Sequence, residues 1–427
     1  MFSIKGESMI LNNKYKVTIV GLDHQGRGIG KIFDKTIFIP NALVGETVEF
    51  NLTTIKKKYL EGELITIINS SEERIKPICP YFSECGGCDL MHTSYFNQLD
   101  YKQHKIKEIF SKFTTIDTSI IDNIVPCDDI YNYRNKVTLQ VNDKIGFYKK
   151  KTNEIVRINK CLISDDVINN IIEELNKLKP FDNIKQIVIR ASKFTNEMMI
   201  AIYTKGIIDE TKIIENLSEF VTSIVKYDNG YQVLYGKPFI TEKMNDLEFI
   251  ISPSSFFQVN TKQAIKLYDK VLEMADLTGK EIIVDLYCGT GTIGLYLSRY
   301  CQKVIGVEVN EDAISDAIKN KELNNIDNIE FISGDVTKII NKLEVIPDIF
   351  VVDPPRSGLD DNIINNLKKY NPSKIIYVSC DPITLARDLE KLRESFDIKH
   401  IFPVDMFANT YHVECVSLLQ RKNPWNS

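Results

Sequence analysis

A cysteine stands at the end of a predicted strand in the stretch "KIIYVSCDPITLARDL", which runs from Lys374 to Leu389. The residues up to Val378 are apolar and rich in β-branched types, which is typical of a buried strand. Pro382 stops that strand, and the pattern "ITLARDLEKL" after it predicts a helix. Cys380 is therefore expected at a strand-to-helix turn, where open α/β sheets bind their ligands. A thiol there suits a nucleophile, although a free cysteine also serves as a small buried apolar residue.

A carboxylate, Glu414, opens the apolar stretch "HVECVSLLQRK" near the end of the chain. A thiol and a base together suit the transfer of a methyl group to C5 of a pyrimidine. A thiolate that adds to C6 turns the ring into an enolate, and the electron density at C5 then attacks a methyl group on a sulfonium. A general base must remove the C5 proton so that the thiolate can leave. The alternative for Glu414 is a surface charge at the edge of a strand.

Three further cysteines are closely spaced in "CPYFSECGGCDL", where Cys79, Cys85 and Cys88 follow a CxxxxxCxxC pattern. Cys161, in "NKCLIS", is a candidate for a fourth ligand. Four thiolates hold either zinc or a cubane iron–sulfur cluster, and the spacing alone leans slightly to zinc. The two glycines before Cys88, however, offer backbone N–H groups to cluster sulfurs. Nine cysteines are an odd number, which in a cytosolic chain favours metal binding or catalysis over disulfides.

The scaffold for these residues is predicted by the pattern from about Leu247 onward. Strands alternate with helices there, which indicates a parallel, doubly wound α/β sheet. The seven expected strands are "EIIVDLYC", "KVIGVEV", "IEFISGD", "DIFVVDPP", "KIIYVSC", "KHIFPVDMF" and "HVECVSLLQRK". The last two are too close in sequence for a crossover helix, so the seventh should run antiparallel. This count and this reversal are those of the class I methyltransferase fold, whose seventh strand lies between the fifth and sixth. Cys380 and Glu414 are then expected to face one pocket.

Glycines after the first of these strands predict a cofactor loop. The stretch "DLYCGTGTIGLYL" contains Gly289, Gly291 and Gly294 in GxGxxG spacing before a helix, which lets the backbone approach a ligand closely. Glu308 ends the second strand, about where an acidic side chain accepts hydrogen bonds from ribose hydroxyls. A nicotinamide dinucleotide would suit this pattern equally well.

Further carboxylates are expected at the same sheet edge, from Asp285, Asp335 and Asp353. Each of them alone is also explained as a helix N-cap. Together they predict an acidic pocket. S-adenosylmethionine carries a sulfonium and an ammonium, so such a pocket favours it over a pyrophosphate cofactor.

Two other regions precede this fold. Between Lys14 and Ile68, five short strands with glycine turns predict a small β-barrel of the OB type. The motif "GLDHQGRGIG" followed by "IPNALVGE" resembles the TRAM domain found on RNA-modifying enzymes. A mixed α/β region without a clean repeat follows. The expected division is a barrel over residues 1–70, a central domain over 71–245 and a methyltransferase domain over 246–427.

Positive charge is concentrated in the N-terminal part, although the whole chain has a net charge of -5. Residues 246–427 hold 20 Lys and Arg against 27 Asp and Glu, whereas residues 1–245 hold 33 against 31. The stretch from Tyr131 to Lys160 has eight basic and two acidic residues, interleaved with aromatics. This basic hairpin is suited to binding the phosphate backbone and unstacked bases of a nucleic acid. The alternative is that its lysines form a solvent-exposed face without a ligand. No apolar run is long enough to cross a membrane and the N-terminus does not read as a signal peptide, so we expect a cytoplasmic protein.

The motifs "FFQVNT", "DLYCGTGTIG", "DPPRSGL", "YVSCDP" and "HVECVSLL", in this order, resemble the RNA uracil-5-methyltransferase family over nearly all of residues 247–420. The resemblance implies that Cys380 is the nucleophile and that Glu414 abstracts the proton. It also implies that S-adenosylmethionine contacts Gln258, Tyr287, Thr292, Glu308, Asp335 and Asp353. The ribosomal-RNA branch of the family has a matching cysteine arrangement, which implies a [4Fe-4S] cluster held by Cys79, Cys85, Cys88 and Cys161. We expect this cluster to be architectural and to clamp the basic hairpin.

The sequence therefore predicts an α/β multidomain enzyme that methylates C5 of a uridine in structured RNA. The expected substrate is 23S ribosomal RNA, with transfer RNA as the runner-up and with no membrane or obligate protein partner. A nicotinamide-dependent oxidoreductase would leave Cys380 and Glu414 without a role. A non-catalytic RNA-binding protein would not need Gln258, Cys380 and Glu414 together. DNA cytosine methylation is the weaker interpretation, because that family's nucleophile follows a proline and Cys380 follows Ser379.

Overall fold

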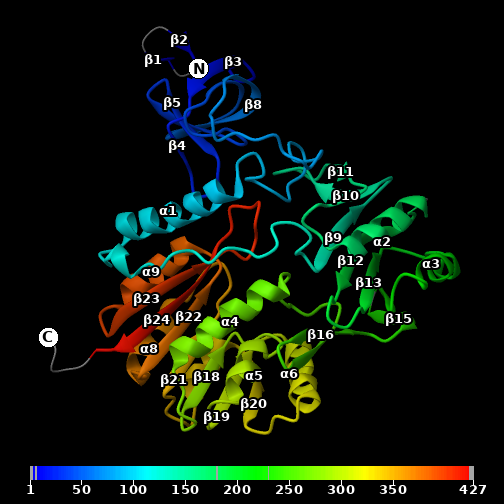
Figure 1. Ribbon diagram of the computed structural model, residues 1–427, viewed down its shortest axis with the longest axis vertical. Helices are drawn as coiled ribbons and strands as arrows, with labels where there is room; N and C mark the ends of the chain where they lie inside the picture. The colour runs from blue at the N-terminus through cyan, green and yellow to red at the C-terminus, as the bar shows by residue number, and fades with distance from the viewer. Residues whose placement is uncertain (1–2, 5–6, 179–180, 229, 423–427) are drawn as a thin grey trace. The chain divides into compact units, whose positions relative to one another are not determined.

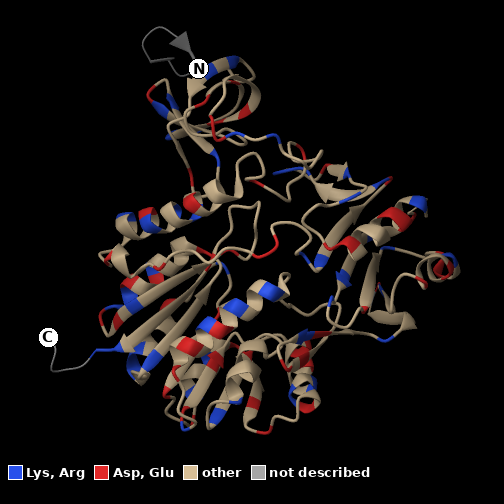
Figure 2. Ribbon diagram, in the orientation of Figure 1, with Lys and Arg blue, Asp and Glu red and all other residues tan. Residues whose placement is uncertain are grey.

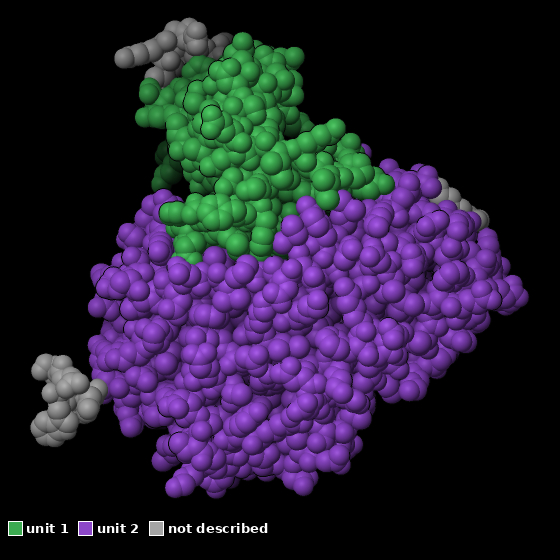
Figure 3. Space-filling model, viewed as in Figure 1, with its two compact units in different colours: residues 1–105, 148–153, 407–412 green, residues 106–147, 154–406, 413–427 purple. Residues whose placement is uncertain are grey.

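The computed structural model describes residues 3–4, 7–178, 181–228 and 230–422. The chain forms two compact units, shown in different colours in Figure 3. Unit 1 comprises residues 1–105, 148–153 and 407–412, and unit 2 comprises residues 106–147, 154–406 and 413–427. Each unit is built from several chain segments. The expected domain boundaries near residues 70 and 245 stay a prediction.

Unit 1 contains a six-stranded β-sheet in the order β3-β7-β8-β6-β5-β4 (Figure 1). Its strands are β3 (Lys14–Thr18), β4 (Gly21–Leu22), β5 (Gly28–Ile32), β6 (Lys35–Ile39), β7 (Thr47–Ile55) and β8 (Tyr59–Asn69), and β1 (Ser3–Ile4) pairs separately with β2 (Glu7–Ser8). Val48, Phe50 and Leu52 alternate along β7 and are fully buried, because one face of the sheet forms the core. Gly62 faces Phe50, and a Cβ at this position would lie 2.4 Å from its ring. The five predicted strands are present, and the short β4 adds a sixth.

The remainder of unit 1 brings distant segments of the chain together. Helix α1 (Tyr95–Phe113) begins in this unit and holds the segment 407–412. The side-chain amide of Gln98 donates to Asn409 Oδ1 at 3.2 Å and accepts from the Asn409 N–H at 2.8 Å. The buried Lys102 donates from Nζ to the carbonyl of Phe407 at 3.1 Å. These contacts fix the segment that leads, two residues later, to Glu414.

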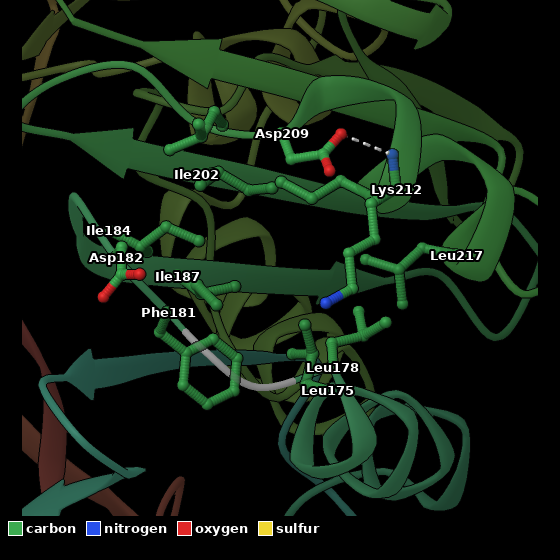
Figure 4. A pocket seen from close by; sticks show the side chains of 12 residues that line it. Leu175, Leu178, Phe181, Asp182, Ile184, Ile187, Ile202, Asp209, Lys212 and Leu217 are labelled. Atoms are coloured by element: carbon green, nitrogen blue, oxygen red, sulfur yellow. Dashed lines mark hydrogen bonds between the residues drawn. The ribbon is translucent and has the colours of Figure 1, made fainter.

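Unit 2 contains two seven-stranded sheets, of which the first is the central sheet, in the order β11-β10-β9-β12-β13-β14-β15. Its strands are β9 (Lys136–Val141), β10 (Ile145–Tyr148), β11 (Ile155–Arg157), β12 (Ile184–Ala191), β13 (Met198–Thr204), β14 (Ser223–Tyr227) and β15 (Tyr231–Gly236). Helices α2 (Asp166–Lys177) and α3 (Glu210–Leu217) pack on one face of it (Figure 1). Figure 4 shows a pocket between these helices and the sheet, where Ile187 and Ile202 meet Leu175 and Leu217.

The second sheet of unit 2 carries most of the residues with predicted chemistry, and its order is β20-β19-β18-β21-β22-β24-β23. The strands are β18 (Ile282–Leu286), β19 (Lys303–Glu308), β20 (Ile329–Ser333), β21 (Ile349–Val352), β22 (Lys374–Ser379), β23 (Phe396–Val404) and β24 (Glu414–Arg421). Strand β24 is antiparallel to both of its neighbours. The predicted count of seven strands, the reversal of the last one and its place between the fifth and sixth are confirmed.

Helices connect the strands of this second sheet. They are α4 (Thr261–Ala275), α5 (Thr292–Ser298), α6 (Glu311–Leu323), α7 (Val336–Ile339), α8 (Asp361–Tyr370) and α9 (Pro382–Leu392), with short 3₁₀ turns η1 (Thr118–Ile120) and η2 (Ile340–Lys342). The strands β16 (Ile240–Met244) and β17 (Leu247–Ile251) form a hairpin before α4. All four residues of β21 are buried, as expected for a parallel strand covered on two faces. Among the described residues, no helix is long and apolar enough to cross a membrane.

Candidate active site

Cys380 lies between β22 and α9, at the strand-to-helix turn that the sequence predicts. Asp381 is the N-cap of α9, and its side chain accepts hydrogen bonds from the N–H groups of Ile383 at 2.8 Å and Thr384 at 3.4 Å. Ser379 Oγ accepts from the Asp381 N–H at 3.2 Å and donates to the Asp381 carbonyl at 3.1 Å. Hydrogen bonds on both sides of Cys380 therefore fix the backbone of the turn.

A second set of hydrogen bonds joins β22 to α9 further back. The buried Asp388 accepts from the Tyr377 hydroxyl at 2.8 Å and from the Leu359 N–H at 2.8 Å. Arg387 adds a contact from Nε to the other carboxylate oxygen at 2.7 Å. These hydrogen bonds connect the strand before Cys380 to the helix after it, so they fix the position of the Cys380 backbone.

Glu414 lies beside Cys380 because of the strand register. Ser379 pairs with Cys415, so the next position on each strand brings Cys380 next to Glu414. The side chain of Glu414 is buried, with 6% of the residue exposed. Burial raises the pKa of Glu414 to about 8, and the charge of Asp353 adds to the rise. Burial also raises the pKa of Cys380 to about 12, and the charges of Glu414 and Asp353 act in the same direction.

Arg356 is a residue whose influence on this site the sequence reasoning missed. It stands in the loop after β21, and its charge lowers the pKa of both Cys380 and Glu414 against the effects of burial. Its signal in the sequence is the single cation in "DPPRSGL" beside Asp353. The cation partly offsets the repulsion between the neighbouring acidic groups.

Asp285, at the end of β18, is a fully buried carboxylate. Among the described residues, neither of its oxygens has a hydrogen-bond partner of normal geometry, although the Gly294 N–H lies near enough to favour the charged form. Burial raises the pKa of Asp285 to about 8, with further rises from Asp353 and Glu308. Burial alone raises the pKa of Asp353 to about 7. Clustered carboxylates without donors fit a ligand that carries positive charge, as S-adenosylmethionine does at its sulfonium and ammonium.

The glycine loop lies next to these carboxylates. Glu308, at the end of β19, accepts hydrogen bonds from the N–H groups of Gly289 at 3.2 Å and Asn310 at 2.9 Å. Gly291 has a φ of +78° and a Cβ there would lie 2.6 Å from the ring of Phe331, so only glycine fits. Tyr287 also has a positive φ, 65°, which is unusual for an aromatic residue. The strained loop is consistent with a functional site.

Gln258 and Thr292 are linked through a residue that the sequence reasoning did not single out, Tyr268 of α4. The Tyr268 hydroxyl lies 3.2 Å from Thr292 Oγ1, and it also interacts with the side chain of Gln258. The backbone carbonyl of Gln258 accepts from Asn135 Nδ2 at 3.1 Å. Gln258 is thus held from two sides.

Asp335 belongs to the same edge of the sheet but has a different environment. It is the N-cap of α7 and accepts from the N–H of Thr337 at 2.8 Å and from its hydroxyl at 2.7 Å. These hydrogen bonds lower the pKa of Asp335. The capping role that the sequence analysis kept as an alternative is therefore present, and it leaves one carboxylate oxygen for other partners.

Three of the four predicted metal ligands stand on one loop of unit 1. Cys79, Cys85 and Cys88 are all partly buried. Cys85 Sγ accepts a contact from the Gly87 N–H at 3.4 Å, the kind of N–H···S interaction that also stabilises cluster sulfurs. Cys161 belongs to unit 2. Within the described residues no group of three or more His, Cys, Asp or Glu is arranged to hold a metal ion, so the cluster stays a prediction.

The cysteine loop contacts part of the basic stretch within unit 1. Cys85 forms a bridge with Lys149, and the Gly86 N–H donates to the Tyr148 carbonyl at 3.0 Å. Lys150 forms an ion pair with Asp89 at 2.6 Å. The loop therefore holds the tip of the basic stretch, whereas a clamp made by a cluster stays a prediction. The other four cysteines are all buried: Cys127, Cys288, Cys301 and Cys415.

The ligand-free protein should lose stability as the pH rises from about 4 to about 8. The pKa of Asp285 is about 8 and that of Asp353 about 7, both above the ordinary 3.8, so the folded state keeps protons that the unfolded state has already lost. Within this window unfolding releases the protons that the folded state still holds, so each pH unit lowers the free energy of unfolding by up to about 1.4 kcal/mol for each of the two groups. Thermal unfolding across this pH range measures the effect.

Asp285→Asn is the matching variant, because it has the same size and no charge at any pH. It should flatten the decline, whereas Asp246→Asn, at a side chain 87% exposed, should not. An Asp285→Asn protein with an unchanged pH profile would contradict the assignment of the buried charge.

Comparison with known proteins gives a consistent result. Residues 94–422 match the family described as tRNA (Uracil-5-)-methyltransferase, and residues 11–65 match the TRAM domain. An uncharacterized RNA methyltransferase of Clostridium tetani (strain Massachusetts / E88) is 38% identical over 444 residues, which cover 96% of this chain and 96% of that protein. Another from Staphylococcus aureus (strain MSSA476) is 36% identical over 442 residues and covers 95% and 97%.

A solved structure extends the likeness to the fold. The crystal structure of Pyrococcus abyssi tRNA (uracil-54, C5)-methyltransferase in complex with S-adenosyl-L-homocysteine is 31% identical, with a TM-score of 0.76, and covers 95% of this chain and 99% of that one. The predicted multidomain α/β fold with a TRAM domain and a methyltransferase sheet is confirmed. The chain belongs to the family of S-adenosylmethionine-dependent RNA uracil-5-methyltransferases with a TRAM domain.

Proposed function

We propose that this enzyme methylates C5 of a uridine in 23S ribosomal RNA through a covalent adduct with Cys380. The observation that carries the proposal is the position of Cys380 beside Glu414, one on each of two adjacent strands. The charge of Asp353 raises the pKa of Cys380, of Glu414 and of the nearby Asp285, so these groups lie close together. A nucleophile, a base and a pocket for a cationic methyl donor are the three parts that this reaction requires.

Cys380 acts as the nucleophile in this proposal. Its sulfur forms a bond to C6 of the flipped-out uracil, and the electron pair of the C5–C6 double bond moves toward O4 to give an enolate. C5 then bonds to the methyl group and still holds its proton. The Glu414 carboxylate takes that proton, the double bond forms again and the carbon–sulfur bond breaks. The products are 5-methyluridine, S-adenosylhomocysteine from the broken sulfonium–methyl bond, a protonated Glu414 and the Cys380 thiolate.

The chain controls when the thiol becomes reactive. In the ligand-free protein, burial and the nearby carboxylates keep Cys380 as a thiol, because both disfavour a second negative charge. Arg356 opposes this effect. S-adenosylmethionine supplies the methyl group and adds positive charge beside the carboxylates when it is bound. We therefore expect Cys380 to attack only after the pocket is filled.

The donor is held, in this proposal, by the six residues that the family resemblance implies. The carboxylates attract the positive groups of the donor and accept hydrogen bonds from its hydroxyls. Gln258 and Thr292 supply polar contacts at positions fixed by Tyr268. The full set is Gln258, Tyr287, Thr292, Glu308, Asp335 and Asp353. Asp285 lies beneath the loop and adds negative charge without an exposed surface of its own.

A [4Fe-4S] cluster held by Cys79, Cys85, Cys88 and Cys161 is part of the same proposal. Three thiols on one loop, with an N–H group directed at Cys85 Sγ, fit such a group by their chemistry. Cys161 follows directly after Lys160, so in this proposal the cluster would fix the end of the basic stretch. Its role would be architectural, since no substrate-facing residue is proposed there.

The choice of ribosomal RNA rests on this cysteine set together with the TRAM domain. Transfer RNA is the second candidate, because the Pyrococcus abyssi enzyme that shares the fold is named for tRNA. The catalytic pair serves both substrates alike. The barrel of unit 1 and the basic hairpin of β9 and β10 are the proposed RNA-holding parts.

RNA that carries 5-fluorouridine at the target position should trap the enzyme. Fluorine cannot leave as a cation, so the adduct through Cys380 persists after methyl transfer and is seen as a shifted band in denaturing gels. Cys380→Ala should give no adduct.

Glu414→Gln should add to ordinary RNA and methylate it, but it should release the product about 100-fold more slowly or slower still. Rapid turnover by Glu414→Gln would remove this residue from the role of base.

The substrate is identified by mapping 5-methyluridine in ribosomal and transfer RNA from cells with and without this protein. We expect 5-methyluridine to disappear from 23S ribosomal RNA and to stay unchanged in transfer RNA. Purified enzyme should restore it in RNA from the deficient cells, and the Cys380→Ala protein should not. Loss confined to transfer RNA would favour the second candidate.

Anaerobically purified protein should contain about four iron and four sulfide ions per chain, rather than one zinc. Cys85→Ser should lower the iron content and weaken RNA binding while S-adenosylmethionine still binds, because the donor pocket lies in unit 2. Cys301→Ser, at a buried cysteine far along the chain, is the control. A protein with one zinc and no iron would reject the cluster but keep the catalytic proposal.

A further inference from the structure

Three tyrosines form a column across the edge of the central sheet. Tyr203 of β13, Tyr227 of β14 and Tyr231 of β15 are direct neighbours in the strand register. The rings of Tyr203 and Tyr227 are stacked, with centroids 4.7 Å apart and planes 10° apart, and the centroids of Tyr227 and Tyr231 are 5.9 Å apart. Strand β15 is the last of the sheet, so the column ends at Tyr231, which is 62% exposed.

The tyrosine column lies on the face of the sheet that α2 and α3 leave open. Ile187 and Ile202 point to these helices and line the cavity shown in Figure 4. Side chains alternate between the two faces along a strand, so the adjacent Gln186 and Tyr203 point to the opposite face. The apolar packing is thus on one side, and the tyrosines are on the other.

A cation without a counter-charge lies on the same helix-free face. Lys136 of β9 pairs with Arg190 of β12. Burial lowers the pKa of Lys136 to about 8, and the nearby charges that act on it are those of Arg190 and Arg134. Among the described residues, no carboxylate forms an ion pair with it. The lysines of α4 (Figure 2) differ, because each has an acidic partner: Lys262 with Asp129, Lys266 with Asp128 and Lys270 with Glu273.

The central sheet also contacts the segment 254–258, which contains Gln258. Asn135, next to Lys136, donates from Nδ2 to the Gln258 carbonyl at 3.1 Å. The buried Arg190 donates from Nη2 to the Ser255 carbonyl at 3.0 Å, in the same segment. Burial raises the pKa of Tyr227 to about 12, and a hydrogen bond with Ser254 opposes the rise, so the column also reaches this segment.

We propose that an unpaired nucleobase of the RNA substrate stacks on the outer ring face of Tyr231, and that Lys136 contacts a phosphate of the same strand. The inference rests on the proposed function and names the part of the substrate that this face recognises. Tyr203 and Tyr227 hold the end ring in place, so stacking on it costs little conformational freedom. Lys136 needs an anion, and an RNA phosphate supplies one.

The test uses the full-length protein and an oligouridylate of about ten nucleotides labelled with a fluorophore. Tyr231→Ala should weaken binding by about 5- to 100-fold, and Tyr231→Phe, which keeps the ring, should stay within about twofold of the wild type. Tyr300→Ala, at a tyrosine 49% exposed beyond the far end of α5, is the matched control and should bind normally. Pairing the probe with its complement should abolish the difference between Tyr231→Ala and the wild type.

A second arm tests the phosphate contact and locates the stacked base. Lys136→Gln should lower the slope of log affinity against log salt by about 0.7, whereas Tyr231→Ala should leave the slope unchanged. A 5-iodouridine probe should crosslink to Tyr231, as read by mass spectrometry of the digested protein. Thermal unfolding of each variant checks that the fold is kept.

The outcomes separate the two proposals. If the wild type forms 5-methyluridine in RNA and Tyr231→Ala binds the oligouridylate as tightly as it does, the stacking inference is wrong and the proposed function stands. If the wild type neither binds RNA nor forms 5-methyluridine, both are wrong. A large loss for Tyr231→Ala with rescue by Tyr231→Phe supports the inference.

Discussion

The insertion of β24 between β22 and β23 is the constraint on which this active site depends. An antiparallel strand in an otherwise parallel sheet begins at the edge where its neighbour ends. Glu414 can therefore open one strand directly beside Cys380, which closes the other. A parallel strand in the same place would have brought its last residue, not its first, to this edge. The reversal places the proposed base next to the proposed nucleophile through strand pairing alone.

The second feature is the concentration of buried acids around that pair. Asp285, Asp353 and Glu414 each have a raised pKa because burial disfavours their charge. Such an arrangement weakens the ligand-free protein and is tolerable where a cationic ligand neutralises it. It also keeps the thiol of Cys380 protonated until then. Binding affinity for the donor and control of the nucleophile thus arise from the same carboxylates.

Local signals made much of the fold predictable from the sequence. Apolar runs followed by Pro382 or by glycines mark the ends of strands, and a connection too short for a crossover helix forces the last strand to reverse. The position of Cys380 at its turn followed from the same signals. The lack of a hydrogen-bond partner for Asp285 among the described residues could not be predicted from local signals, because it depends on how the surrounding side chains pack.

Long-range register explains the other features that the sequence did not reveal. Tyr203 and Tyr227 are far apart in the chain and become neighbours only because β13 and β14 pair in parallel. Arg356 gained its role from proximity to two residues on other strands. Cys161 matched its partners in type, but whether it joins them depends on how two units meet, and spacing in the sequence carries no information about that.

The path of the chain near its end has a further consequence. Residues 407–412 belong to unit 1, where Gln98 and Lys102 hold them, and the chain enters unit 2 at residue 413, immediately before Glu414. The base is therefore tethered to a segment that the N-terminal half of the protein immobilises. A fragment that begins after α1 would retain every strand of the methyltransferase sheet and yet lack the anchor of its own proton acceptor. The proposed base and the N-terminal segment that anchors it are in this sense not separable.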